Sequence, residues 1–148
     1  MLLPVKGGAV EEEAIDLACE LVKGSKGKVY ATYVIEVPRD LPLDAEVAEE
    51  TARGEIILKE VEKAVRKRHC QVEAQLLQAR DAGPALVQEA AEKAVGVIVL
   101  ALPYMRRLGN FTLGDTVPYI LKNAPCQVLL WRNSMVFDSS NGASSGTR

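Results

Sequence analysis

The sequence is short of the residues that mark disulfide frameworks, metal sites and charged binding surfaces. It has three cysteines and one histidine among 148 residues, and its formal net charge is only −2. An odd cysteine count without metal-ligand spacing excludes a disulfide framework and is typical of reduced thiols in a cytoplasmic protein. Because the charge is small and basic residues are interspersed among acidic ones, nucleic acid is not expected as a partner.

Long apolar stretches are missing as well. No apolar run approaches the roughly 18 residues that a membrane-spanning helix needs, and no signal peptide opens the chain. We therefore expect a soluble, cytoplasmic protein without direct membrane insertion.

The sequence contains no catalytic constellation. His69 follows residues 66–68 (RKR) at a predicted helix end, where a cation interacts favourably with the helix dipole. Cys19 and Cys126 lie in apolar contexts and are expected in the core, whereas Cys70 lies at a turn where it can be exposed. Since paired carboxylates and metal-ligand clusters are also absent, we expect neither an enzyme nor a metal site.

The length fits one domain. A chain of 148 residues buries about 70% of its unfolded surface, which suffices for a full core without staples. We expect this domain at residues 1–132. Residues 133–148 are rich in Ser, Gly and Asn and predict a disordered C-terminal tail.

Apolar periodicity predicts an α/β fold. Residues 97–102 (VIVLAL) form an unbroken apolar run, typical of a strand buried on both faces of a parallel sheet. Residues 71–77 alternate between polar and apolar, which predicts a sheet edge. The other strands are expected at 2–5, 29–37 and 127–131, with helices at 11–22, 47–65, 83–95 and from Thr116. The expected inward face of the first helix is Ala14, Leu17, Ala18, Leu21 and Val22, and that of the third helix is Leu86, Val87, Ala90, Ala91 and Ala94. Alternation of strands and helices predicts parallel crossover units.

Four motifs resemble those of the universal stress protein family. Residues 113–116 (LGDT) and 123–132 (NAPCQVLLWR) resemble the family's last helix start and its "APCPVL" ending. Residues 3–8 (LPVKGG) resemble its opening "VPVDGS", and residues 33–37 (YVIEV) resemble its second strand. The resemblance covers about residues 2–132. It implies an open five-stranded parallel sheet in the order 3-2-1-4-5, Rossmann-like, with helices on both faces.

Residues 37–43 (VPRDLPL) are similar to the second-strand exit in domains appended to amino-acid permeases. Together with the short first strand, this favours a domain cut from a longer chain and tethered to a membrane transporter as one alternative.

The pocket implied by the resemblance is altered in this sequence. ATP-holding members carry a loop of the form G-x2-G-x9-G-S/T after the fourth strand and a carboxylate after the first. Counted back from Gly114, the first two glycine positions are Ala101 and Tyr104, the Ser/Thr position is Asp115, and the carboxylate position is Lys6. Side chains at the glycine positions fill the loop, Asp115 repels phosphate, and a lysine cannot accept hydrogen bonds. The resemblance therefore predicts a degenerate nucleotide site.

Several interpretations stay open at this pocket. Lys6 either pairs with Asp115 or receives a small anionic ligand. Arg106 and Arg107 form either a solvated loop or a phosphate clamp. Asp115 or Thr116 can serve as an N-cap of the last helix. The loop glycines are needed for backbone conformation whatever the ligand. The candidate pocket comprises Val5, Lys6, Val34, Ala101, Tyr104, Arg106, Arg107, Gly109, Gly114, Asp115 and Thr116.

The expected function is that of a regulatory or interaction module without a cofactor. The alternative is a stress-response or transporter-regulatory domain that binds ATP, AMP or a cyclic dinucleotide weakly, through an altered phosphate loop. The last strand is nearly all apolar although it is expected at an edge, and such edges favour pairing with another strand. We therefore expect a homodimer through Val128, Leu129 and Leu130.

Overall fold

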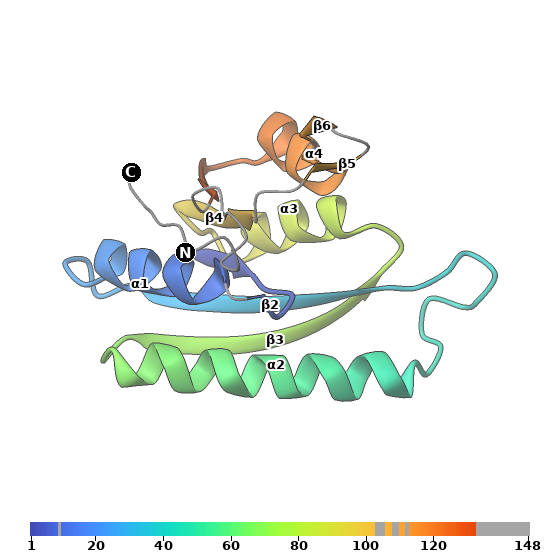
Figure 1. Ribbon diagram of the computed structural model, residues 1–148, viewed down its shortest axis with the longest axis horizontal. Coiled ribbons are helices and arrows are strands. Elements are labelled where there is room, and N and C mark those ends of the chain that lie inside the picture. Colours follow the sequence, from blue (N-terminus) through green and yellow to red (C-terminus); the bar gives the residue numbers. More distant parts are fainter. Residues whose placement is uncertain (9, 103–105, 108–109, 112, 133–148) are drawn as a thin grey trace, which may run out of the picture.

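A five-stranded parallel sheet forms the centre of the molecule (Figure 1). The computed structural model describes residues 1–8, 10–102, 106–107, 110–111 and 113–132. The strands are β1 (Leu2–Pro4), β2 (Lys28–Glu36), β3 (Gln71–Ala79), β4 (Val97–Leu102) and β7 (Gln127–Arg132), in the order β3-β2-β1-β4-β7. All four pairings are parallel. The expected order 3-2-1-4-5 and the edge position of the alternating strand are confirmed.

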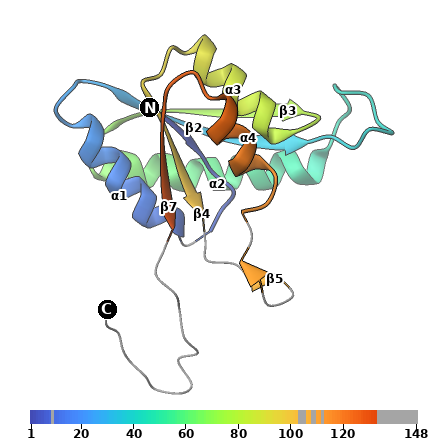
Figure 2. The ribbon, with the colours of Figure 1, turned by 90° about the horizontal axis from the view of Figure 1, so that it is seen from above.

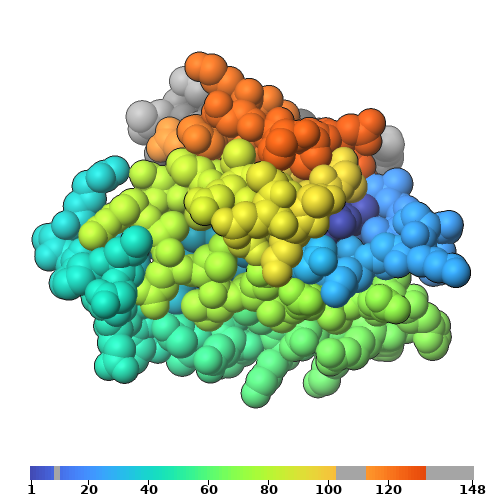
Figure 3. Space-filling model, turned by 180° about the vertical axis from the view of Figure 1, so that it is seen from behind, coloured from blue at the N-terminus to red at the C-terminus, as the bar shows by residue number. Residues whose placement is uncertain are grey.

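Four helices cover the two faces of this sheet. They are α1 (Val10–Val22), α2 (Ala48–Lys67), α3 (Ala82–Glu92) and α4 (Thr116–Asn123). One apolar cluster joins α1 and α2 to Leu3, and a second joins α3 and α4 to Leu2. Because consecutive strand residues point to opposite faces, α1 and α2 cover one face and α3 and α4 the other. In Figure 3, α4 (orange) lies at one end of the molecule and α2 (green) at the opposite end.

Two helix faces differ from the expected ones. In α3, Ala91 is exposed, and Ala94 lies beyond the helix end at Glu92 with a φ of 50°. Glu89 takes an inward place and is buried. In α1, Leu21 is 46% exposed, and Ile15 and Cys19 complete the buried face instead.

A small hairpin was not expected from the sequence. The two-residue strands β5 (Arg106–Arg107) and β6 (Asn110–Phe111) pair antiparallel. In Figure 2 the hairpin lies beyond the carboxyl ends of β4 and β7, which run side by side. Within the described residues, every helix is too short or too polar to span a membrane.

Candidate ligand site at the carboxyl edge of the sheet

The carboxyl ends of β1 and β4 meet at the centre of the sheet. Leu2 of β1 lies opposite Ile98 of β4 in a parallel pair, so both strands run towards the carboxyl edge, where Val5 follows β1 and Ala101 lies near the end of β4. Val5 is buried, and half-buried Ala101 packs against the cluster that contains it. Ligands of open parallel sheets bind outside such carboxyl ends, where the strand order reverses. The fold therefore assembles the framework of the expected site.

Glu11 organises the turn between β1 and α1, a role that the sequence analysis missed. Its side chain is only 8% exposed. Its two carboxylate oxygens accept hydrogen bonds from the backbone N–H groups of Lys6 at 2.5 Å and Gly7 at 2.9 Å. The backbone N–H of Glu11 in turn donates to the carbonyl of Gly8 at 3.1 Å. The spacing Gly8-x-x-Glu11 resembles a capping box, which was the available signal.

Burial shifts the pKa of this carboxyl group. Desolvation raises the pKa of Glu11, and the backbone N–H groups of Lys6, Gly7 and Gly8 and the charge of Lys6 partly offset that rise. The side chain of Glu11 is thus a hydrogen-bond partner of the backbone amides in this turn.

Lys6 stands where the family pattern has a carboxylate, and it is exposed. Among the described side chains, the ion pairs do not include one between Lys6 and Asp115. The first interpretation of Lys6, an ion pair with Asp115, is therefore not found in the structure.

The start of α4 forms the other side of the site. Gly114 has a φ of 72°, a conformation that side chains rarely adopt, which confirms that its glycine is needed for the backbone. Asp115 occupies the N-cap position, is exposed, and makes no side-chain capping hydrogen bond. Thr116 is the half-buried first residue of the helix. Asp115 therefore has the expected N-cap position, but the expected capping hydrogen bond of its side chain is not formed.

The remaining candidates divide into two groups. Val34 is half-buried on β2 and packs against the α3–α4 cluster. The backbones of Arg106 and Arg107 form β5, where the sequence predicted a loop. Tyr104 and Gly109 lie outside the described residues.

The three residues expected at a dimer interface lie on the edge strand β7. Among the described strands, β4 is its one partner in the sheet. Leu129 and Leu130 are 40% and 41% exposed, and Val128 is half-buried.

The histidine and two of the thiols lie at the amino ends of strands, away from the carboxyl edge of the sheet: His69 and Cys70 precede β3, and Cys126 precedes β7. Cys19 and Cys70 are buried, and Cys126 is half-buried. The expected exposure of Cys70 is wrong because the turn at His69, whose φ is 61°, folds back and lets the N–H of Cys70 donate to the carbonyl of Val65 at 3.2 Å. The described residues contain no group of three or more metal-ligating side chains that could hold an ion.

Two cavities are hollowed in the described surface. The larger, about 730 Å³, lies between α1 and α2 and reaches Gly7 and Gly8. The smaller, about 440 Å³, lies between α3 and the end of β3. Neither of these two extends to the start of α4.

This architecture defines an open, doubly wound α/β protein of the class that binds ligands at a strand switch point. The model of the universal stress protein family matches residues 1–132, and the chain belongs to that family. A universal stress protein of Methanocaldococcus jannaschii is 28% identical over 136 residues, which cover 88% of this chain and 79% of that protein.

Solved structures share the fold. The universal stress protein from Archaeoglobus fulgidus in complex with dAMP superposes with a TM-score of 0.70 at 18% identity, covering 87% of this chain and 94% of that one. A universal stress protein family protein from Arabidopsis thaliana with AMP bound gives 0.63 at 15% identity, covering 90% and 91%. Similarity at this level of identity establishes the fold, and the ligands belong to those proteins.

Proposed function

We propose that this chain is a regulatory or interaction module of the universal stress protein family that does not hold ATP in the mode implied by the family pattern. One observation carries the proposal: the helix starts at the carboxyl edge of the sheet carry the chain's own carboxylates. Glu11 accepts from two backbone N–H groups of the turn that leads into α1, and Asp115 stands at the N-cap of α4. Phosphate favours free backbone N–H groups and helix N-termini, so these carboxylates disfavour its binding there.

A third helix start supports the same reasoning. At α3, the carboxylate of Glu36 accepts a hydrogen bond from the backbone N–H of Ala82 at 2.9 Å. Glu36 ends the neighbouring strand β2, so this carboxylate also lies at the carboxyl edge. Carboxylates of the chain thus lie at three helix starts along this edge, and two of them accept hydrogen bonds from backbone N–H groups. The proposed module acts through contacts with other molecules instead of through catalysis.

The test is calorimetry with Mg-ATP. The wild-type protein should give no saturable heat up to about 1 mM nucleotide, which corresponds to roughly −4 kcal/mol of binding free energy. The combined variant Lys6→Asp, Ala101→Gly, Tyr104→Gly and Asp115→Ser restores the family pattern and should bind measurably. Asp115→Asn serves as a control that removes one charge without restoring the glycines.

The second candidate function is nucleotide binding in an altered mode. It is favoured by exposed Lys6 and by the AMP and dAMP complexes of structurally similar proteins. Micromolar affinity of the wild-type protein for ATP or AMP would contradict the first proposal and support this one. Loss of that affinity in Lys6→Ala would assign the phosphate contact to Lys6.

A further inference from the structure

The groove between α1 and α2 has the size of a ligand site. Its volume of about 730 Å³ lies within the range of about 300–1,000 Å³ that is usual for small-molecule pockets. The groove is lined by both helices and ends at the β1–α1 turn, where a side chain on Gly7 would come within 2.7 Å of Ile57. It lies on the face of the sheet opposite α3 and α4.

The groove has an apolar base and an apolar rim. Ile15 and Val61 are buried there, and Ile57 and Ala64 are half-buried. Ile56, on the rim, is 64% exposed, more than any other large apolar residue in the described part of the chain. Because burying such a side chain contributes about 1.5–3 kcal/mol, an isoleucine left in water beside a groove favours an apolar ligand.

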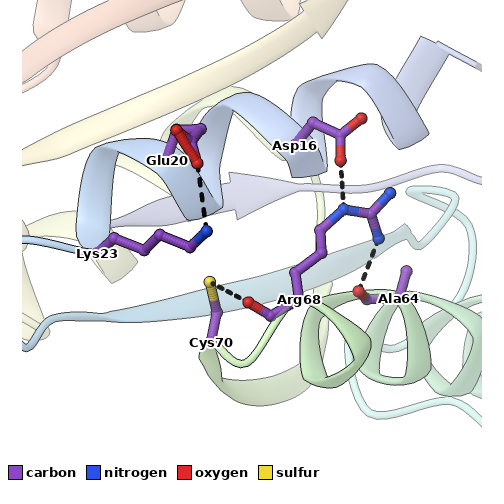
Figure 4. A network of polar contacts seen from close by, with 6 residues as sticks. All are labelled: Asp16, Glu20, Lys23, Ala64, Arg68 and Cys70. Carbon is purple, nitrogen blue, oxygen red and sulfur yellow. Dashed lines mark hydrogen bonds and ion pairs between the residues drawn. The ribbon is translucent and has the colours of Figure 1, made fainter.

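An ion pair closes one end of the groove. The Nε of Arg68, at the end of α2, donates to Oδ1 of Asp16 on α1, and its guanidinium also donates to the carbonyl of Ala64 at 2.7 Å (Figure 4). Arg68 is thereby committed to the two helices. It fixes their spacing at this end and is not available for a ligand.

Two lysines beside this closed end are available. Lys63 and Lys67 line the groove one turn apart on α2, both are exposed, and the ion pairs of the described residues include neither. Like charges at this spacing destabilise a helix slightly. The position of Lys67 in the last turn suits the helix dipole, but Lys63 lies too far from the end for that explanation. The pair instead suits one anionic group.

Carboxylates line the rest of the groove. Glu12 lies near the start of α1, and Glu60 lies one turn of α2 before Lys63. Both are exposed, and the ion pairs found among the described residues include neither. An anion bound there would be repelled, so the groove distinguishes a ligand with one charged end from a ligand with two.

We propose that the α1–α2 groove binds a long-chain aliphatic monocarboxylate. The carboxylate lies at Lys63 and Lys67, and the chain runs over Ile15 and Ile57 towards Ile56. This site uses neither Lys6 nor Asp115, so it stands whether or not the protein binds a nucleotide.

The experiment is isothermal titration of the full chain with dodecanoate below its micellar concentration. One ligand should bind per chain, and Lys63→Glu with Lys67→Glu should weaken the affinity at least tenfold, which corresponds to about 1.4 kcal/mol for the two charge-assisted contacts together. Lys59→Glu, an exposed lysine of the same helix outside the groove, should leave the affinity unchanged. Dodecanedioate should bind more weakly than dodecanoate because its second carboxylate meets Glu12 and Glu60.

A separate variant tests the apolar contact between the ligand chain and Ile56. Ile56→Ser removes the exposed rim side chain and should weaken dodecanoate binding about fivefold without changing the circular dichroism spectrum, because the ligand chain loses an apolar contact at the rim. The proposal is overturned if wild-type protein shows no saturable heat, or if the Lys63/Lys67 variant binds as tightly as Lys59→Glu. Co-sedimentation with phosphatidylglycerol vesicles in the absence of free dodecanoate binding would point to a membrane surface and would also overturn it.

Discussion

The carboxylate of Glu11 accepts a hydrogen bond from the backbone N–H of Gly7 at 2.9 Å. A side chain at the start of α1 thereby stabilises the β1–α1 loop that precedes the helix. The other oxygen of Glu11 accepts from the N–H of Lys6. Both donors belong to the turn that leaves the central strand β1, and a buried N–H without a partner costs about 1–3 kcal/mol. Glu11 therefore stabilises the centre of the carboxyl edge whether or not a ligand binds there.

Glu11→Gln should destabilise the fold by about 1–3 kcal/mol, because the amide NH₂ group would face one of the two backbone donors. Urea unfolding followed by circular dichroism measures this change. Glu12→Gln, at the exposed neighbouring position, should change the free energy of unfolding by less than about 0.5 kcal/mol. Equal effects of the two substitutions would show that the Glu11 hydrogen bonds contribute nothing specific.

The same carboxylate should produce a pH dependence of stability. Burial raises the pKa of Glu11 in the folded state, so the folded protein binds this proton more tightly than the unfolded chain does. The free energy of unfolding, relative to Glu11→Gln, should therefore rise as the pH falls through the raised value and level off below the ordinary glutamate pKa. A difference that declines over this window would contradict the assigned direction.

The sequence predicted the sheet more completely than it predicted the site. The buried strand at residues 97–102 and the edge strand at residues 71–77 followed from hydrophobic patterns, because burial on one face or two leaves a readable signal, whereas the strand order followed from the family resemblance. The hairpin at Arg106–Arg107 was missed because two-residue strands have no periodicity. Ala91 was misplaced because an alanine fits either face of a helix.

At the site, the family pattern identified Lys6 and Asp115 but not Glu11. A pattern reports which residue types replace the usual ones, whereas the hydrogen bonds of Glu11 depend on how the turn folds back over its carboxylate. The α1–α2 groove could not be predicted from the sequence either. Its lining residues come from two helices, and the spacing of these helices depends on contacts such as the Arg68–Asp16 ion pair.

Gly54→Ala should destabilise the protein although alanine favours helices by about 1 kcal/mol. A Cβ on Gly54 of α2 would lie 2.7 Å from Cδ1 of buried Tyr33 and 2.9 Å from Cδ1 of Leu76. Overpacking of this kind costs about 1–3 kcal/mol, so we expect a net loss near 1 kcal/mol and a Tm lower by about 2–4 °C. Gly96→Ala, where no atom lies within 4 Å of the added Cβ, is the matched control. A higher Tm for Gly54→Ala would show that α2 can move away from the sheet.

The thiol of Cys19 should be inert in the folded protein. Burial and the neighbouring Cys70 thiol raise the pKa of Cys19 to about 12. At pH 8 about one part in ten thousand would be thiolate, the reactive form. Iodoacetamide should therefore modify half-buried Cys126 before Cys19, and Cys19 should react only when urea unfolds the chain. Peptide mass spectrometry resolves the three sites, and equal rates for Cys19 and Cys126 in native buffer would refute the assignment.

The edge strand β7 should mediate a homodimer. It lies at the edge of the described sheet, and its two adjacent leucines are about 40% exposed, one on each face of the strand. Apolar edges of this kind favour pairing with another copy. Sedimentation equilibrium at micromolar concentration should give a dimer, and Leu129→Asp or Leu130→Asp should give a folded monomer. Leu21→Asp alters an equally exposed leucine on α1 and should leave the dimer intact. A folded wild-type monomer, or dissociation by Leu21→Asp as well, would exclude β7 as the specific interface.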